Sequence, residues 1–229
     1  MSQNLLKRII TSIILLSLLF FISFSHQNVF IMAILIIGLI ICVEANSLFS
    51  KLLFTKILKK NLFFKKFNLK FIIFNIIVFC YIFFIFCGLS YEIHKSEGAV
   101  FFLYIISICF FTDIGGYVVG KTIGGKKLSK ISPNKTISGT IGSFLFSIIP
   151  LLFLLNIVYL DLTLSFNNIL FCLLISLVSQ SGDLFISFLK RKAKIKDTGK
   201  ILPGHGGVLD RLDGIIFAVP FSYLLLKFI

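Results

Sequence analysis

Acidic residues are scarce in this chain, which has 9 Asp and Glu against 23 Lys and Arg in 229 residues. The resulting formal net charge is +14. Such a strongly positive charge is also typical of nucleic-acid-binding proteins. The Lys and Arg residues do not form a stripe with interleaved aromatic residues, as a nucleic-acid-binding surface would. They cluster between apolar segments, so the sequence predicts no nucleic-acid partner.

Paired cysteines are missing as well. The chain has no CxxC pair and no His at ligand spacing from a Cys, and its five cysteines all lie inside apolar runs: Cys42, Cys80, Cys87, Cys109 and Cys172. They are predicted to be packed or lipid-facing small residues, with neither disulfides nor a thiolate metal site.

Polar residues are too few for a soluble protein. Hydrophobic residues make up 58% of the chain, 29 of them are Phe, and the mean hydropathy is +1.04. A soluble chain of this length could not bury so much apolar surface in one core. The sequence therefore predicts an all-α, polytopic integral membrane helical bundle with about seven transmembrane helices.

The expected spans are apolar runs at Ile9–Phe24, Val29–Val43, Phe71–Leu89, Ala99–Val118, Ile141–Leu160, Ile169–Leu189 and Ile215–Ile229. The first run lacks an A-x-A-like exit, so it is interpreted as an uncleaved span and not a signal peptide. The first two runs are shorter than the ~20 residues that cross a bilayer, which leaves a tilted or interfacial hairpin open.

Two regions are predicted. Residues 1–70 form an N-terminal membrane hairpin and a basic amphipathic segment, and residues 71–229 form a catalytic transmembrane domain. Seven lysines between Lys51 and Lys70 alternate with Leu and Phe, which indicates a helix lying on anionic headgroups.

The distribution of cations predicts the orientation. With the N-terminus inside, 21 of the 23 Lys and Arg residues lie on the cytoplasmic side, as the positive-inside rule requires. The predicted location is a bacterial-type inner (cell) membrane, with multiple passes and an active site facing the cytoplasm. This orientation also gathers the polar clusters around Asp113, residues 119–140, Asp183 and residues 190–213 at one membrane face.

Carboxylates in these clusters suit a divalent metal. Asp183, Asp210 and Asp213 offer hard oxygen ligands for Mg²⁺ held together with substrate phosphates. Asp210 and Asp213 would share a face of a helix that starts near Val208. The alternative is that each Asp caps a helix or pairs with a neighbouring Lys.

Glycines surround His205 in the sequence PGHGG. Gly204, Gly206 and Gly207 allow the backbone to approach an anion closely, although His205 is also compatible with a simple loop residue. The segment GGYVVGKT at 115–122 satisfies the G-x-x-x-x-G-K-[ST] pattern, but its first half ends a membrane span and no buried strand precedes it. We therefore do not interpret this segment as the phosphate-binding loop of a nucleotide hydrolase. Four lysines in and after it are retained as candidate phosphate contacts: Lys121, Lys126, Lys127 and Lys135.

Several ordered segments together resemble the phosphatidate cytidylyltransferase family, also called CDP-diacylglycerol synthases. They are SQSGD at 179–183, SFLKR at 187–191, Lys196-Asp197 and LPGHGGVLDRLD at 202–213, preceded by Asp113, Tyr117, Gly120 and the SPxKTxxG pattern at 132–139. The match covers roughly the C-terminal half. Ser138 replaces an acidic residue that is common before the glycine of KTxxG, and the chain is shorter at its N-terminal end than many relatives.

The resemblance implies cytidylyl transfer from CTP to phosphatidate, with Mg²⁺ as cofactor and the lipid bilayer as surroundings; a homodimer is left open. It implies catalytic roles for Asp183, Asp210, Asp213 and Lys135, with the three aspartates at the metal. The implied substrate contacts are Lys190, Arg191, Lys196, Asp197, His205, Gly206, Gly207, Arg211, Ser132, Thr136 and Asp113.

Two other functions are compatible with parts of the pattern. A CTP-dependent polyprenol or phytol kinase would also use a nucleotide and Mg²⁺, but the complete HGGxxDRxD run at 205–213 argues against it. An ion-coupled transporter would use Asp113 and Asp183 in an ion pathway. The halves of the chain show no inverted repeat of polar positions, which argues against a transporter.

Overall fold

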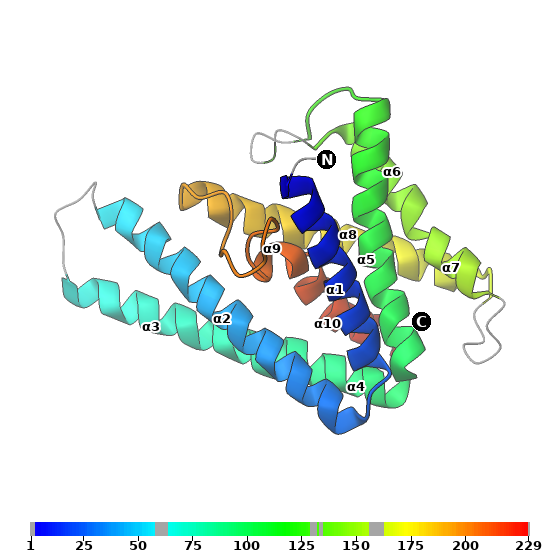
Figure 1. The fold of residues 1–229 in the computed structure, drawn as a ribbon, viewed down its shortest axis with the longest axis horizontal. Coiled ribbons are helices and arrows are strands. Elements are labelled where there is room, and N and C mark those ends of the chain that lie inside the picture. Colours follow the sequence, from blue (N-terminus) through cyan, green and yellow to red (C-terminus); the bar gives the residue numbers. More distant parts are fainter. Residues whose placement is uncertain (1–2, 58–63, 129–131, 133–134, 156–162, 229) are drawn as a thin grey trace. The chain divides into compact units, whose positions relative to one another are not determined.

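The computed structural model describes residues 3–57, 64–128, 132, 135–155 and 163–228. The part of the chain that it describes is helical, with two isolated β-bridges and no strand, so the all-α prediction is confirmed (Figure 1). The chain divides into two compact units, Met1–Glu92 with Phe188–Leu212 and Ile93–Ser187 with Asp213–Ile229. These discontinuous units differ from the predicted division at residue 70.

The first unit is built around α2. Its helices are α1 (Gln3–Ser23), α2 (Gln27–Ile57), α3 (Phe64–Cys80), the π-helix η1 (Tyr81–Cys87), most of α4 (Gly88–Ser96), the last turn of α8 (Phe166–Lys192) and the short α9 (Leu209–Leu212). α2 contacts α1, α3, η1 and α9, and α2 and α3 lie side by side in Figure 1. Phe30, Ile41 and Leu48 form the buried side of α2.

The second unit packs helices through small residues. It contains α5 (Gly98–Thr122), α6 (Ile137–Ser147), α7 (Ile149–Leu154), α8 up to Ser187 and α10 (Ile215–Leu225). α5 contacts α6, α7 and α10. The expected span over Ile141–Leu160 overlaps α6 and α7, which together make one candidate span, Ile137–Leu154, with a break at Ile148. Pro150, in the first turn of α7, accounts for this break because proline lacks the N–H that would continue α6.

Five helices of the described residues are long and apolar enough to cross a membrane: Gln27–Leu52, Phe71–Ser96, Gly98–Thr122, Ile137–Leu154 and Phe166–Lys192. They match five of the seven expected spans. The first expected span corresponds to a shorter apolar helix, Arg8–Ser23. The last corresponds to α10, which has 11 residues.

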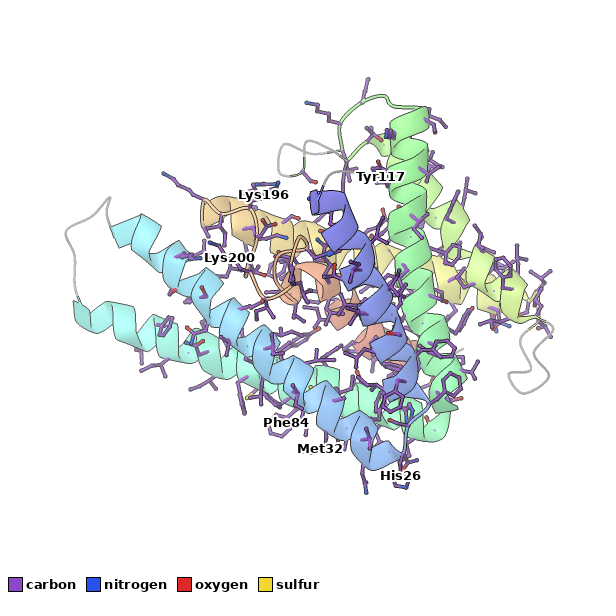
Figure 2. The ribbon with its side chains drawn as sticks, in the orientation of Figure 1. His26, Met32, Phe84, Tyr117, Lys196 and Lys200 are labelled. Atoms are coloured by element: carbon purple, nitrogen blue, oxygen red, sulfur yellow. The ribbon has the colours of Figure 1, made fainter. Side chains whose placement is uncertain are left out.

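Large apolar side chains remain exposed along these helices. Met32 on α2 is 60% exposed and Phe84 on η1 is 73% exposed, and both point outward in Figure 2. Such surfaces would be unfavourable in water but suit lipid. The composition and the helices are those of a polytopic membrane protein.

The basic segment 51–70 is not one separate helix. Lys51–Ile57 continues α2, and Phe64–Lys70 begins α3. The residues between them, 58–63, lie outside the described part of the chain. Of the seven lysines, Lys51 and Lys56 lie on α2, and Lys65, Lys66 and Lys70 lie on α3, whereas Lys59 and Lys60 are among residues 58–63.

Candidate active site

The last cytoplasmic segment of the sequence prediction forms an ordered loop in the first unit. We call residues 198–208 the glycine loop. Gly204 and Gly206 have φ values of +77° and +87°, which other residues rarely adopt. Leu202 and Gly206 form an isolated β-bridge, so the chain turns back at Pro203–His205. Glycine is required here by backbone conformation as well as by any close approach to an anion.

Asp210 on α9 holds the two ends of the glycine loop. Its Oδ2 accepts hydrogen bonds from the backbone N–H groups of Thr198 and Gly207, at 2.8 and 2.9 Å, and its Oδ1 accepts one from Lys190 at 2.9 Å. Burial by itself raises the pKa of the Asp210 carboxyl, but the bonds from Lys190 and the two backbone groups outweigh it and lower that pKa below its ordinary value. Asp210 is therefore ionised at neutral pH, and its carboxylate accepts hydrogen bonds from three donors.

A polar pocket of about 510 Å³ lies against the glycine loop within the first unit. It is lined by Arg8, Lys196, Asp197, Gly199, Lys200, Leu202, Pro203, Gly204, His205, Gly206 and Arg211. Lys196 and Lys200 project from the segment that follows α8 (Figure 2). Four of the lining residues are cationic and one is acidic, so the pocket has the charge expected of an anion site. Five predicted substrate contacts therefore lie together here: Lys196, Asp197, His205, Gly206 and Arg211.

His205 is anchored to α1. Thr11 Oγ1 lies 2.6 Å from His205 Nδ1, and Ser12 Oγ lies 3.3 Å from Nε2. Burial and the charge of Arg211 lower the pKa of His205, with a further contribution from Arg8. The ring is therefore neutral at pH 7, where it can exchange hydrogen bonds with the two hydroxyls.

Sequence reasoning missed Glu44, on α2. Its side chain is buried, and its oxygens accept hydrogen bonds from Thr198 Oγ1 and from the backbone N–H groups of Val208 and Leu209. A signal was present in the sequence. Glu44 directly follows the apolar run Val29–Val43, and isolated ionisable residues in or at the end of a span are functional candidates by default.

The second unit contains a separate group of charged residues. Lys135 forms an ion pair with Asp183 Oδ2, and Ser187 Oγ donates to Asp183 Oδ1 at 3.1 Å. The Asp213 carboxyl is also within hydrogen-bonding reach of Asp183. Two carboxyls this close are favourable only with a proton or a cation beside them, and Lys135 supplies a positive charge.

Small residues allow Asp213 to approach α8. A Cβ atom on Gly182 would lie 2.9 Å from the Asp213 carbonyl oxygen, and one on Gly214 would lie 2.5 Å from Ser179 Oγ. Larger side chains at either glycine would push the start of α10 away from α8. The glycines of SQSGD and of the Asp213-Gly214 pair therefore help to bring the Asp183 and Asp213 carboxyls together.

The other predicted contacts have different surroundings. Lys190 is paired with Asp210 and Gly207 is a buried residue of the glycine loop, whereas Arg191 is exposed at the end of α8. Thr136 is the N-cap of α6, and its hydroxyl accepts from the Gly139 N–H at 3.1 Å. Asp113 lies on α5, and the Ser132 carbonyl accepts from the Lys135 N–H. Their roles toward substrate stay predictions.

The segment at 115–122 is helix throughout, so it forms no phosphate-binding loop. Its glycines make room for α6 instead. A Cβ atom on Gly115 would lie 2.5 Å from the Gly142 carbonyl oxygen, and one on Gly120 would lie 3.0 Å from Thr136 Oγ1. Glycine-mediated close approach is a common way for membrane helices to pack.

The described residues fit Mg²⁺ better at Asp183 and Asp213 than at Asp210. Asp183 and Asp213 present two neighbouring carboxyls, a donor set that Mg²⁺ accepts when phosphate and water complete its coordination. Asp210 already accepts three hydrogen bonds. No group of three or more His, Cys, Asp or Glu side chains in the described ranges forms a complete metal site, so the metal stays a prediction.

Comparison with known proteins bears on this arrangement. The model of the cytidylyltransferase family matches residues 46–229. The chain belongs to this family. The match includes both α8 and the glycine loop, and it begins two residues after Glu44.

Curated relatives of this chain carry a more specific name. The chain is 36% identical over 183 residues to "Phosphatidate cytidylyltransferase" of Bacillus subtilis (strain 168), covering 76% of this chain and 64% of the relative. It is 45% identical over 134 residues to the protein of the same name from Staphylococcus aureus (strain COL), covering 58% and 51%. A third, from Staphylococcus haemolyticus (strain JCSC1435), is 41% identical over 133 residues, with the same coverage. The chain thus spans about half to two thirds of the length of these relatives.

Proposed function

We propose that the protein transfers a cytidylyl group from CTP to phosphatidate, giving CDP-diacylglycerol and diphosphate. The observation that carries this proposal is the cationic pocket against the glycine loop, in a chain whose family match includes that loop. Relatives named for this activity support the choice of substrates. The product would serve phospholipid biosynthesis.

In this reaction an oxygen of the phosphatidate phosphate forms a bond to the α-phosphorus of CTP, and the bond from that phosphorus to the β-phosphate oxygen breaks. The second pKa of a phosphate monoester is about 6, so the attacking group is already largely dianionic near neutral pH. No strong general base is needed. The protein has to neutralise charge and hold the reacting groups in line.

The pocket in the first unit supplies cations for phosphate groups. Arg8, Lys196, Lys200 and Arg211 line it, and charge-assisted hydrogen bonds from such side chains are stronger than neutral ones. Asp210 takes no part in direct anion binding, because a carboxylate repels phosphate. Its role is to fix the loop through Thr198, Gly207 and Lys190.

The charged group in the second unit suits a cation and a phosphate. Asp183 and Asp213 would hold Mg²⁺, which when bound would neutralise charge on the nucleotide phosphates. Lys135 pairs with Asp183, and we propose that its ammonium group also contacts a phosphate oxygen. The predicted role of Asp210 as a further metal ligand would require it to exchange one of its three present donors.

We propose that both groups of residues face the cytoplasm of a bacterial cell. The support is the count of cations, 21 of 23 on the inner side of the predicted topology. A cytoplasmic site lets water-soluble CTP meet a lipid headgroup in the bilayer. Cysteines introduced at Lys127 and Lys194 should resist a membrane-impermeant reagent in intact cells, whereas one at Glu97 should react. External labelling at Lys194 would reverse the proposed topology.

Labelled nucleotides distinguish this activity from that of a lipid kinase. The purified protein in detergent is given CTP labelled at either the α- or the γ-phosphate, with phosphatidate or a polyprenol as acceptor. Cytidylyl transfer puts only the α-label into lipid, and only with phosphatidate. A kinase would put the γ-label into the polyprenol, and absence of any labelled lipid would reject both. The Asp183→Asn variant serves as the inactive control.

A further inference from the structure

We propose that Glu44 is a positioning residue that fixes the glycine loop and the start of α9. Glu44 lies outside residues 46–229, the part of the chain that matches the family. Its effect on turnover rests on the cytidylyl transfer proposed above. Its effect on the loop does not depend on that reaction.

The hydrogen bonds of Glu44 reach both ends of the glycine loop. Oε2 accepts from Thr198 Oγ1 at 3.1 Å and from the Leu209 N–H at 2.8 Å, and Oε1 accepts from the Val208 N–H at 3.1 Å. The side chain comes from α2, more than 150 residues earlier in the chain. One carboxylate thus ties the first and last residues of the loop to a long apolar helix.

The backbone N–H groups that donate to Glu44 have few other acceptors available. Val208 and Leu209 stand at the start of α9, where the N–H groups of a helix have no carbonyl of the preceding turn to bind. Glu44 is 3% exposed and Leu209 is 2% exposed, so water cannot readily replace the carboxylate. A donor left unpaired in such a place is costly.

Two glycines provide the space for this carboxylate. A Cβ atom on Gly207 would lie 2.5 Å from Glu44 Oε2 and 2.6 Å from Oε1, and a Cβ atom on Gly199 would overlap Oε1 as well. Neither glycine has a positive φ. Their lack of a side chain is therefore explained by the Glu44 carboxylate and not by backbone conformation.

Glu44 and Asp210 hold the same short stretch from two sides. Asp210 accepts hydrogen bonds from the N–H groups of Thr198 and Gly207. Glu44 accepts them from the Thr198 hydroxyl and from the N–H groups of the two residues after Gly207, Val208 and Leu209. Together the two carboxylates fix the backbone that shapes one wall of the cationic pocket. Loss of Glu44 should therefore disturb the pocket without removing any group that lines it.

The test compares Glu44→Gln with Glu97→Gln, the same substitution at an exposed glutamate. An amide keeps the size of the side chain but presents an NH₂ group to the Val208 or the Leu209 N–H, whichever way it is turned. Hydrogen exchange followed by mass spectrometry should show slow exchange over 198–212 in the wild type. In Glu44→Gln this exchange should be roughly ten- to hundred-fold faster, and in Glu97→Gln unchanged. Fast exchange in the wild type, or no change in Glu44→Gln, would overturn the proposal.

Activity gives a second measurement. Glu44→Gln should raise the KM for CTP about ten-fold or more, with a smaller change in kcat, because the pocket is loosened while the charged residues of α8 remain. Gly199→Ala should lose activity through overlap with Glu44, and the shorter side chain of Glu44→Asp should restore part of it in the double variant. Strictly additive losses would overturn the positioning role even if Glu44→Gln folds poorly. If the wild type makes no CDP-diacylglycerol, the proposed function fails, while the exchange result still decides the role of Glu44.

Discussion

Lys190 and Asp210 form an ion pair with a nitrogen-to-oxygen distance of 2.9 Å, although 20 residues separate them in the sequence. Their side chains are only 12% and 5% exposed, so water screens the pair weakly. The pair joins the last turn of α8 to α9 and closes the segment that carries the glycine loop. Its stability contribution can be tested without any substrate.

Removing both partners of this pair should cost less stability than the two single removals added together. Lys190→Met leaves the Asp210 carboxylate without its cation, which we expect to lower the free energy of unfolding by about 1–3 kcal/mol. The double variant Lys190→Met with Asp210→Asn should be less destabilised than the sum of its single changes. Thermal unfolding in detergent measures both effects, with Lys192→Met as the exposed control. An unfolding temperature for Lys190→Met equal to that of the wild type would contradict the prediction.

Acid should release the glycine loop from α1. The pKa of His205 is lowered by burial and by Arg211 and Arg8, so the folded protein resists protonation of this ring. The contribution of neutral His205 to stability is fully present above the ordinary value of about 6.5, and it is lost as the pH falls toward the lower folded-state pKa. Hydrogen exchange over 198–212 should therefore accelerate as the pH falls below about 6.5. Asp210 does not contribute to this change, because its pKa is lowered from an already acidic value.

The control for the pH dependence is His205→Asn, which cannot titrate. Its exchange rate, corrected for the intrinsic effect of pH on exchange, should be flat over this interval. A wild-type profile that is equally flat would mean that the contacts of His205 with Thr11 and Ser12 do not hold the loop.

Loss of the Lys135 ammonium group should reduce catalysis more than stability. Lys135→Ala removes the cation that pairs with Asp183, and one lost charge-assisted contact costs about 1.5–3 kcal/mol, or roughly ten- to hundred-fold in kcat/KM. Lys95→Ala, at an exposed lysine outside the candidate phosphate contacts, is the control. Equal activity in the two variants would assign Lys135 to the charges that only set membrane orientation.

The magnesium dependence of three variants should separate the roles of the carboxylates. Asp183→Asn should abolish product formation, and Asp213→Asn should demand a higher Mg²⁺ concentration, because each removes a charge from the proposed metal site. Asp210→Asn should lose activity with an unchanged Mg²⁺ dependence, since we assign it to the loop. Titration of activity against Mg²⁺ for each purified variant makes the comparison. A normal Mg²⁺ dependence in Asp183→Asn would remove the metal from this position.

Much of the architecture follows from local sequence. Long apolar runs can satisfy their backbone groups in lipid only as helices, so the all-α class and five of the expected spans were predictable. The glycines at 204 and 206 follow from the tight turn around His205. The location of charged residues near Asp183, Asp210 and Lys135 also pointed to the part of the chain where the candidate site lies.

Other patterns were ambiguous by themselves. The glycines at 115–122 fit both a phosphate-binding loop and a helix-packing surface, and only the approach of Gly142 and Gly139 on α6 decides for packing. The expected seventh span was set by apolar composition up to Ile229, whereas α10 as described ends at Leu225 and is too short to cross a bilayer alone.

The sequence by itself determined the helices, the apolar surface and the residue types available for phosphate chemistry. Tertiary structure decided which carboxylate accepts from which donor. Asp183 pairs with a lysine 48 residues away, and Glu44 binds backbone groups 164 and 165 residues away. Because every carboxylate can pair with any Lys or unpaired N–H group, local sequence does not specify these partners. Folding selects them, since only the packed helices bring a particular carboxylate and a particular donor out of water together.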